Sequence, residues 1–182
     1  MRNHFNLRPA VNALLMSIAA ISLTACGSMM MAQGPSAIAP LQARSGSSVS
    51  GTVKFVQQGD QVMATVKVAG LKPGQEHGFH IHDKGDCSSP DGMSAGGHFN
   101  PTAKPHGPQA SEHHGGDMPA LKADASGNAT AMFNLRGVTV TDGPTSIVGH
   151  SLIVHKDPDD YTTQPTGNSG ARIACGVITK AS

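Results

Sequence analysis

The sequence has little of what helical or nucleic-acid-binding proteins need. It has no Trp, one Tyr and only 3% aromatic residues. No segment combines a sustained helical period with capping residues, and no run of basic residues forms the electrostatic footprint of a nucleic-acid-binding protein. The 22 Gly and 12 Pro among 182 residues instead predict short strands joined by many turns.

The first 25 residues have the features of an export signal. Arg2 and Arg8 precede an apolar stretch over residues 11–23 that is too short for a permanent membrane span. We therefore expect residues 1–25 to be a signal peptide. Without its two arginines, the chain has 11 Lys and Arg against 12 Asp and Glu, a formal net charge of −1.

The end of this segment, Leu-Thr-Ala-Cys at 23–26, resembles the lipobox of bacterial lipoproteins. The resemblance implies cleavage before Cys26 and lipid attachment to its sulfur; the alternative is ordinary cleavage that leaves a free cysteine. Residues 26–47, rich in Met, Ser, Ala, Pro and Gly, are expected to form a flexible tether. Gly27 favours sorting to the outer membrane, so the expected location is the bacterial periplasmic space, with a lipid anchor in that membrane.

The sequence contains three cysteines, an odd number for an exported chain. If Cys26 carries lipid, only Cys87 and Cys175 remain to pair, in a compartment that permits disulfides. We therefore expect one disulfide between them; the alternative is two buried free thiols.

Residues 48–182 have the pattern of an all-β domain. Apolar and polar residues alternate over 49–55 and 62–68, which predicts a hairpin with one buried face. Further strands are expected over 78–82, 129–135, 151–155 and 173–178. The prediction is an antiparallel Greek-key β-sandwich or barrel with two long loops, roughly 83–120 and 156–171, which by their length are expected to be functional.

Ten histidines are present, and most lie in or beside these two loops. In an extended strand, side chains alternate faces, so His80 and His82 project to the same side. A segment dense in His, Gly and Pro follows and ends at Asp117. This arrangement indicates a metal site.

Several motifs occur in the order typical of copper/zinc superoxide dismutases of the bacterial periplasmic type, and the chain resembles that family over about residues 49–179. These motifs are Gly-Phe-His-Ile-His at 78–82, Gly-His-Phe-Asn-Pro at 97–101, Pro-His-Gly at 105–107, His-Gly-Gly-Asp at 114–117, Gly-His-Ser-Leu-Ile-Val-His at 149–155 and Gly-Ala-Arg-Ile-Ala-Cys-Gly-Val-Ile at 170–178.

The resemblance implies two metal ions that share one imidazole. Copper would be bound by His80, His82, His98 and His155, and zinc by His98, His106, His114 and Asp117. A set of four imidazoles suits Cu(II), while three imidazoles and a carboxylate suit tetrahedral zinc.

The resemblance also assigns roles outside the two ligand sets. Arg172 would hold an anion beside copper by charge-assisted hydrogen bonds. Asp159 would connect a copper-ligand imidazole to a zinc-ligand imidazole. His113 and His114 compete for one zinc position, and the spacing to the aspartate favours His114. His77 is expected to make structural hydrogen bonds.

The implied activity is dismutation of superoxide to oxygen and hydrogen peroxide in the bacterial envelope. The alternative is an envelope lipoprotein that binds or buffers copper and zinc without turnover. The expected partners are superoxide and, through Cys26, a membrane, with no nucleic acid. The linker between Cys87 and His98 is short, which leaves the oligomeric state open, with a homodimer as the expectation.

Overall fold

The computed structural model describes Met1 and residues 34–181. The predicted signal and the lipidation residue Cys26 therefore lie outside the described residues. Within those residues, no helix is both long and apolar enough to cross a membrane. The secondary structure consists of β1 (Ser36–Ala43), β2 (Ser50–Gln58), β3 (Gln61–Ala69), β4 (Glu76–His77), β5 (Phe79–His82), the 3₁₀ turn η1 (Met93–Ala95), β6 (Leu121–Lys122), β7 (Ala129–Leu135), β8 (Ser151–His155), β9 (Arg172–Val177) and β10 (Thr179–Lys180).

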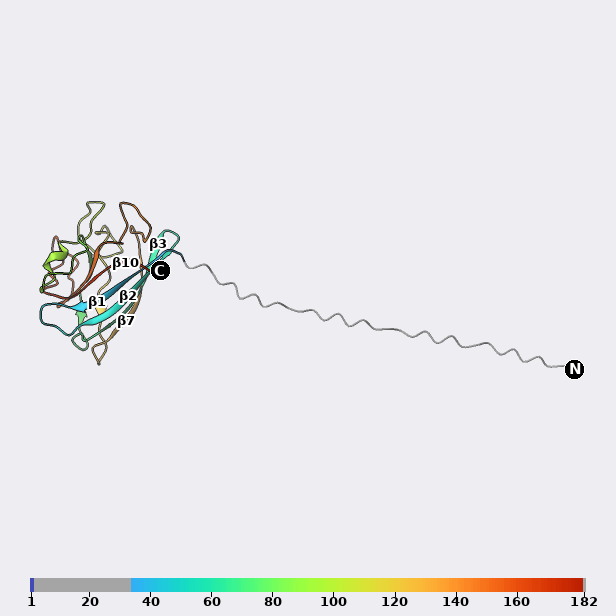
Figure 1. Cartoon of the computed structure of the whole chain (residues 1–182), viewed down its shortest axis with the longest axis horizontal. Coiled ribbons are helices and arrows are strands. Elements are labelled where there is room, and N and C mark those ends of the chain that lie inside the picture. The colour runs from blue at the N-terminus through green and yellow to red at the C-terminus, as the bar shows by residue number, and fades with distance from the viewer. Residues whose placement is uncertain (2–33, 182) are drawn as a thin grey trace. The chain divides into compact units, whose positions relative to one another are not determined.

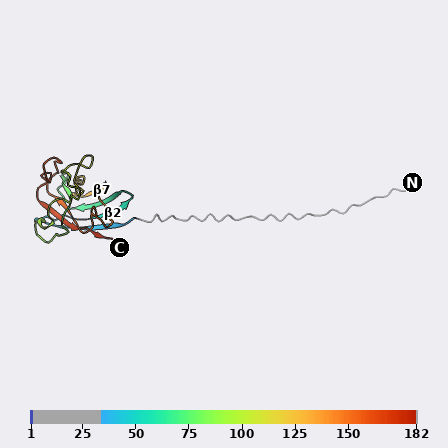
Figure 2. The same cartoon turned by 90° about the horizontal axis from the view of Figure 1, so that it is seen from above.

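The main sheet is antiparallel and follows the order β5-β8-β9-β1-β2-β3-β7, with β10 also paired to β1. Figure 1 shows β1, β2, β3 and β7 side by side, and β2 and β7 remain together in the turned view of Figure 2. β1 pairs with both β9 and β10, so the first strand of the described chain lies beside its last two strands. This confirms the predicted all-β antiparallel fold.

The hairpin of β2 and β3 is the one that the alternating pattern predicts. Its register ends at the pair Gln58 and Gln61, which leaves a two-residue turn. Gly59 in this turn has a φ of 61°, a left-handed conformation that glycine adopts without strain. Val53 and Phe55 are fully buried, whereas Lys54 between them is exposed.

The predicted tether is wrong for residues 36–43, because they form β1 near the centre of the sheet. Ala37, Ala39 and Leu41 alternate into the hydrophobic core. The physical reason is that apolar residues at every second position are enough to bury one face of a strand, although the composition of the segment is that of a linker. The prediction for residues 26–33 lies outside the described part of the chain.

The two long loops lie where they were predicted, between β5 and β6 at 83–120 and between β8 and β9 at 156–171. The first loop folds back along β5. The Ile81 N–H donates to the Gly116 carbonyl at 2.8 Å, and the Phe99 N–H donates to the Ile81 carbonyl at 2.9 Å. These backbone bonds hold the histidine-rich loop against the His80 strand.

Candidate metal centre

β5 presents two imidazoles to one side and two apolar side chains to the other. Phe79 and Ile81 are fully buried in the main core. His80 and His82 are equally buried but alternate with them, and so face the long loops. Packing of Phe79 and Ile81 thus fixes the direction in which both imidazoles point.

Two further imidazoles complete the first cluster. His155 ends β8, and its Nε2 lies 3.3 Å from Nε2 of His82. The loop residue His98 forms an isolated antiparallel bridge with His82. His80, His82, His98 and His155 are all buried, and one ring nitrogen of each lies within 4.8 Å of the others.

The opposite ring nitrogens of this cluster have fixed hydrogen-bond partners. His82 Nδ1 donates to the Gly96 carbonyl at 2.9 Å, and His155 Nδ1 donates to the Gly170 carbonyl at 3.2 Å. Since a carbonyl only accepts, each of these rings carries its lone pair on Nε2 when neutral. His80 Nδ1 and His98 Nε2 are buried without any hydrogen-bond partner.

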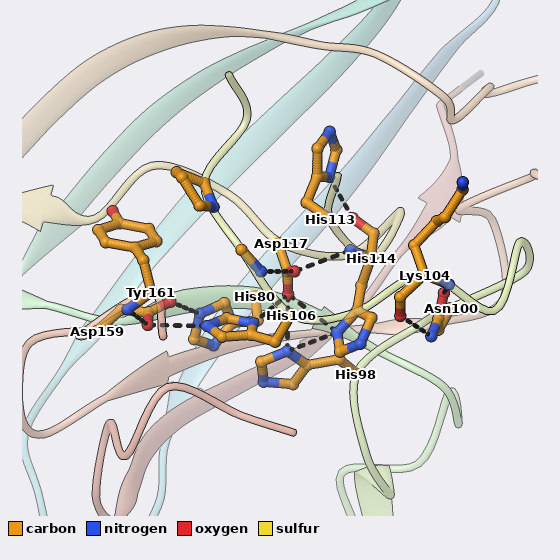
Figure 3. A network of polar contacts seen from close by, with 12 residues as sticks. His80, His98, Asn100, Lys104, His106, His113, His114, Asp117, Asp159 and Tyr161 are labelled. Atoms are coloured by element: carbon orange, nitrogen blue, oxygen red, sulfur yellow. Dashed lines mark hydrogen bonds and ion pairs between the residues drawn. The ribbon is translucent and has the colours of Figure 1, made fainter. Parts of the chain in front are cut away.

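The second cluster surrounds one carboxylate oxygen, Asp117 Oδ1. It lies 2.8 Å from His98 Nδ1, 3.0 Å from His106 Nδ1 and 3.3 Å from His114 Nδ1. Figure 3 shows these side chains converging from the 83–120 loop. The other carboxylate oxygen accepts the backbone N–H groups of Gly107 and His114, which fixes the orientation of Asp117.

Asp159 joins the two clusters from the second loop. Its carboxylate lies 2.6 Å from Nε2 of His80 and 3.0 Å from Nε2 of His106 (Figure 3). The position predicted for Asp159 is therefore the one observed. Sequence reasoning missed Gly167, where an added Cβ would lie 1.8 Å from Asp159 Oδ1 and 2.6 Å from His106 Nε2, too close for any side chain.

The donor atoms of the two clusters fit a copper ion and a zinc ion. Nitrogen ligands of one cation, bound at about 2.0–2.1 Å, lie about 3–4 Å apart. The Nε2 atoms of His82 and His155 are 3.3 Å apart, within this range, although neither atom donates a proton to the other. Together with the unpartnered nitrogens of His80 and His98, this geometry favours bound cations over hydrogen bonds between the rings.

Burial sets the charge state of the first cluster. It lowers the pKa of His80 from 6.5 to about 4, and it lowers the pKa values of His82 and His155 as well, with neighbouring histidines adding to the effect. These three rings are therefore neutral at pH 7, the form in which imidazole binds metal.

His106 in the second cluster behaves in the opposite way. Burial by itself would lower the pKa of His106, but hydrogen bonds to Asp117 and Asp159 outweigh burial and raise the pKa to about 9. The same contacts hold the pKa values of both carboxyl groups well below their ordinary range, despite their burial. Asp117 and Asp159 therefore keep His106 protonated at pH 7 until a metal cation takes the place of the proton.

Arg172 begins β9 and lies at the mouth of the first cluster. Its guanidinium donates to the Gly92 carbonyl at 2.8 Å and to the Gly96 carbonyl at 2.7 Å. Gly96 thus accepts from both Arg172 and His82. Arg172, His82 and His155 line a cleft of about 450 Å³ that opens to solvent. Backbone carbonyls carry no residue-type signal, so sequence reasoning could not find the roles of Gly92 and Gly96.

The predicted disulfide between Cys87 and Cys175 is present. It connects β9, which carries Arg172, to the loop that supplies Gly92 and Gly96. Arg44 adds a hydrogen bond to the Cys87 carbonyl at 3.0 Å. The loop is therefore held at the cleft from two sides.

The remaining histidines near the site lie outside both clusters. His77 Nδ1 donates to the carbonyl of His155 at 2.9 Å, which agrees with the structural role expected for it. His113 is turned away, with its Nδ1 against the carbonyl of His114. The second cluster therefore includes His114 and excludes His113.

Comparisons with known proteins agree with this geometry. The family model described as copper/zinc superoxide dismutase matches residues 49–178. Superoxide dismutase [Cu-Zn] 2 from Aquifex aeolicus is 40% identical over 135 residues, which cover 71% of this chain and 79% of that protein. Residues 49–178, which the family model matches, contain both clusters.

Solved structures show the same fold. A SOD-like protein from Bacillus subtilis, crystallised as a double mutant, is 40% identical, with a TM-score of 0.69 over 76% of this chain and 94% of that one. The clock protein EA4 is 33% identical, with a TM-score of 0.74 over 82% of this chain and 96% of that one. On the match over residues 49–178 and the two metal-ligating clusters that share His98, the chain belongs to the copper/zinc superoxide dismutase family.

Proposed function

We propose that the protein catalyses the dismutation of superoxide. The observation that carries this proposal is a pair of buried clusters sharing His98, with an arginine in the cleft that opens onto one of them. The reaction converts two superoxide anions and two protons to one oxygen and one hydrogen peroxide. It therefore needs an electron acceptor and donor, a cationic group for the substrate, and a path for protons.

The proposed ligand sets follow the two clusters. Copper is assigned to His80, His82, His98 and His155, and zinc to His98, His106, His114 and Asp117. When bound, copper supplies a one-electron redox couple, and zinc supplies a positive charge beside His98. His98 then has Nε2 toward the first cluster and Nδ1 toward the second.

Arg172 is proposed to bind the substrate anion. Two carbonyls hold its guanidinium in place, and guanidinium has five N–H donors, so donors remain for an anion in the cleft. Because the group is positioned before the substrate arrives, little side-chain entropy is lost when the anion binds.

His98 is proposed to carry a proton at Nε2 in one half of the cycle and to release it in the other. Its Nδ1, 2.8 Å from Asp117 Oδ1, stays with the second cluster and keeps the ring in position. Asp159 and the Gly96 carbonyl orient the neighbouring rings of His80 and His82 in the same way.

A second candidate function is copper and zinc binding without turnover. The names of the structural relatives favour keeping it, since one is called a clock protein and another SOD-like. Metal storage needs the eight ligand positions but has no use for an arginine in an open cleft. A superoxide dismutase assay on protein loaded with both metals separates the two functions, because storage alone predicts bound metals and no turnover.

We also propose that the protein is exported in a bacterium and anchored to the outer membrane through lipid on Cys26. The support is the sequence of residues 1–26. Lipid labelling and membrane fractionation of the full chain should show both the label and the membrane association lost in Cys26→Ser. The homodimer stays a prediction, which light scattering of the purified protein tests.

A further inference from the structure

The cleft that opens onto His82 and His155 carries two opposite charges. Among the described residues that line it, Arg172 and Asp91 are the ones with a full formal charge. Arg172 attracts any anion. Asp91 has no place in the proposed reaction, and its position in an anion-binding cleft requires an explanation.

One turn fixes both charges. Asp91 Oδ1 accepts the backbone N–H of Met93 at 3.0 Å, so the carboxylate is held within its own turn. The next residue, Gly92, has a φ of 71° and directs its carbonyl to the Arg172 guanidinium at 2.8 Å. The turn at residues 91–93 therefore holds the guanidinium of Arg172 through Gly92 and also carries the carboxylate of Asp91.

The two charges also act on one another. The pKa of Asp91 lies below its ordinary value, first because of the bond from the Met93 N–H and further because of the positive charge of Arg172. The carboxylate is therefore ionised at neutral pH. Its negative charge makes the electrostatic potential in the cleft more negative and so repels an entering anion.

Coulomb energy is proportional to the charge of the ligand, so Asp91 repels a dianion about twice as strongly as a monoanion. A guanidinium alone has the opposite preference, since it binds multiply charged oxyanions well. Without Asp91, the cleft would favour sulfate-like dianions, which would block access to His82 and His155.

We infer that Asp91 is a specificity-determining residue of this cleft, whose fixed carboxylate selects small monoanions over multiply charged oxyanions. That the favoured monoanion is superoxide rests on the proposed function. The charge selection itself does not, since it concerns binding alone.

The test compares azide, a monoanion, with sulfate, a dianion, on the copper- and zinc-loaded protein at constant ionic strength. Azide binding is followed by the copper absorption, and sulfate by its competition with azide. Asp91→Asn keeps an oxygen for the Met93 N–H and removes the charge. Asp86→Asn is the matched control, because Asp86 lies in the same loop, is exposed and accepts the Ser88 N–H at 2.7 Å, yet does not line the cleft.

If Asp91→Asn tightens azide binding about threefold, it should tighten sulfate binding by the square of that factor, about tenfold. Asp86→Asn should change both by less than about 1.5-fold. Equal changes for azide and sulfate, no change for either, or the same changes in Asp86→Asn would overturn the inference. A protein without superoxide turnover that shows this anion selection would contradict the proposed function and leave the inference standing.

Discussion

The carboxylate of Asp159 lies 2.6 Å from Nε2 of His80, and both side chains are completely shielded from solvent. The residues are 79 positions apart in the chain and come from different parts of the fold. The same carboxylate reaches His106 in the second cluster at 3.0 Å. One residue outside both ligand sets therefore orients a ring in each.

Asp159→Asn should weaken zinc and copper binding by about 10- to 100-fold each, because the amide keeps the shape of the side chain but loses the charge that fixes both rings. Competition with chelators of known affinity measures both constants. Asp160→Asn is the matched control, since Asp160 is exposed and bonds within its own turn. Equal losses in both variants would contradict the role of Asp159.

His98→Ala should disturb both metals, because His98 is the residue common to the two clusters. His113→Ala should leave zinc bound, since this ring faces the carbonyl of His114 and not the cluster. Metal content by mass spectrometry after dialysis checks both variants. Zinc loss in His113→Ala comparable to that in His98→Ala would contradict the exclusion of His113 from the zinc ligands.

The sequence predicts most of the site, because its motifs contain the side chains that bind metal. The alternation of apolar residues and histidines over 79–82 predicts that His80 and His82 share one face of a strand, as they do in β5. The carbonyls of Gly92, Gly96 and Gly170 could not be predicted, since any residue supplies the same oxygen and only tertiary packing aims it. β1 was missed because its composition is that of a linker.

Zinc uptake by metal-free protein should release a proton from His106 at pH 7, because the pKa of this group is raised to about 9 in the folded chain. Calorimetric titration in buffers of different ionisation enthalpy counts the protons. His106→Gln should reduce the count by about one.

The sign of the stability effect follows from the same shift. The raised pKa stabilises the metal-free fold fully below pH 6.5, and this contribution is lost as the pH rises through about 9. The free energy of unfolding of the metal-free protein should therefore fall over this interval, and fall less in His106→Gln. An identical pH dependence in the variant would contradict the assignment.

Loss of the disulfide should lower both stability and activity. Replacing Cys87 and Cys175 by serine removes a crosslink that spans 88 positions, at a cost of about 2–5 kcal/mol in the free energy of unfolding. It also releases the loop whose carbonyls hold Arg172. Denaturant titration and the dismutase assay measure the two effects, and full activity in a destabilised variant would separate them.

Arg172→Ala should slow superoxide turnover by about 10- to 100-fold while copper stays bound, since a charge-assisted hydrogen bond contributes about 1.5–3 kcal/mol. Arg172→Lys should recover part of the rate, because the charge remains but the fork of donors is lost. Arg136→Ala, at an exposed position outside the cleft, is the control.

The proposed activity is tested most directly by the superoxide dismutase assay on wild-type protein reconstituted with one copper and one zinc per chain. Turnover should depend on copper and should be reduced in Arg172→Ala at equal copper content. Full occupancy of both metals without turnover would rule out the proposed activity and leave metal binding as the function.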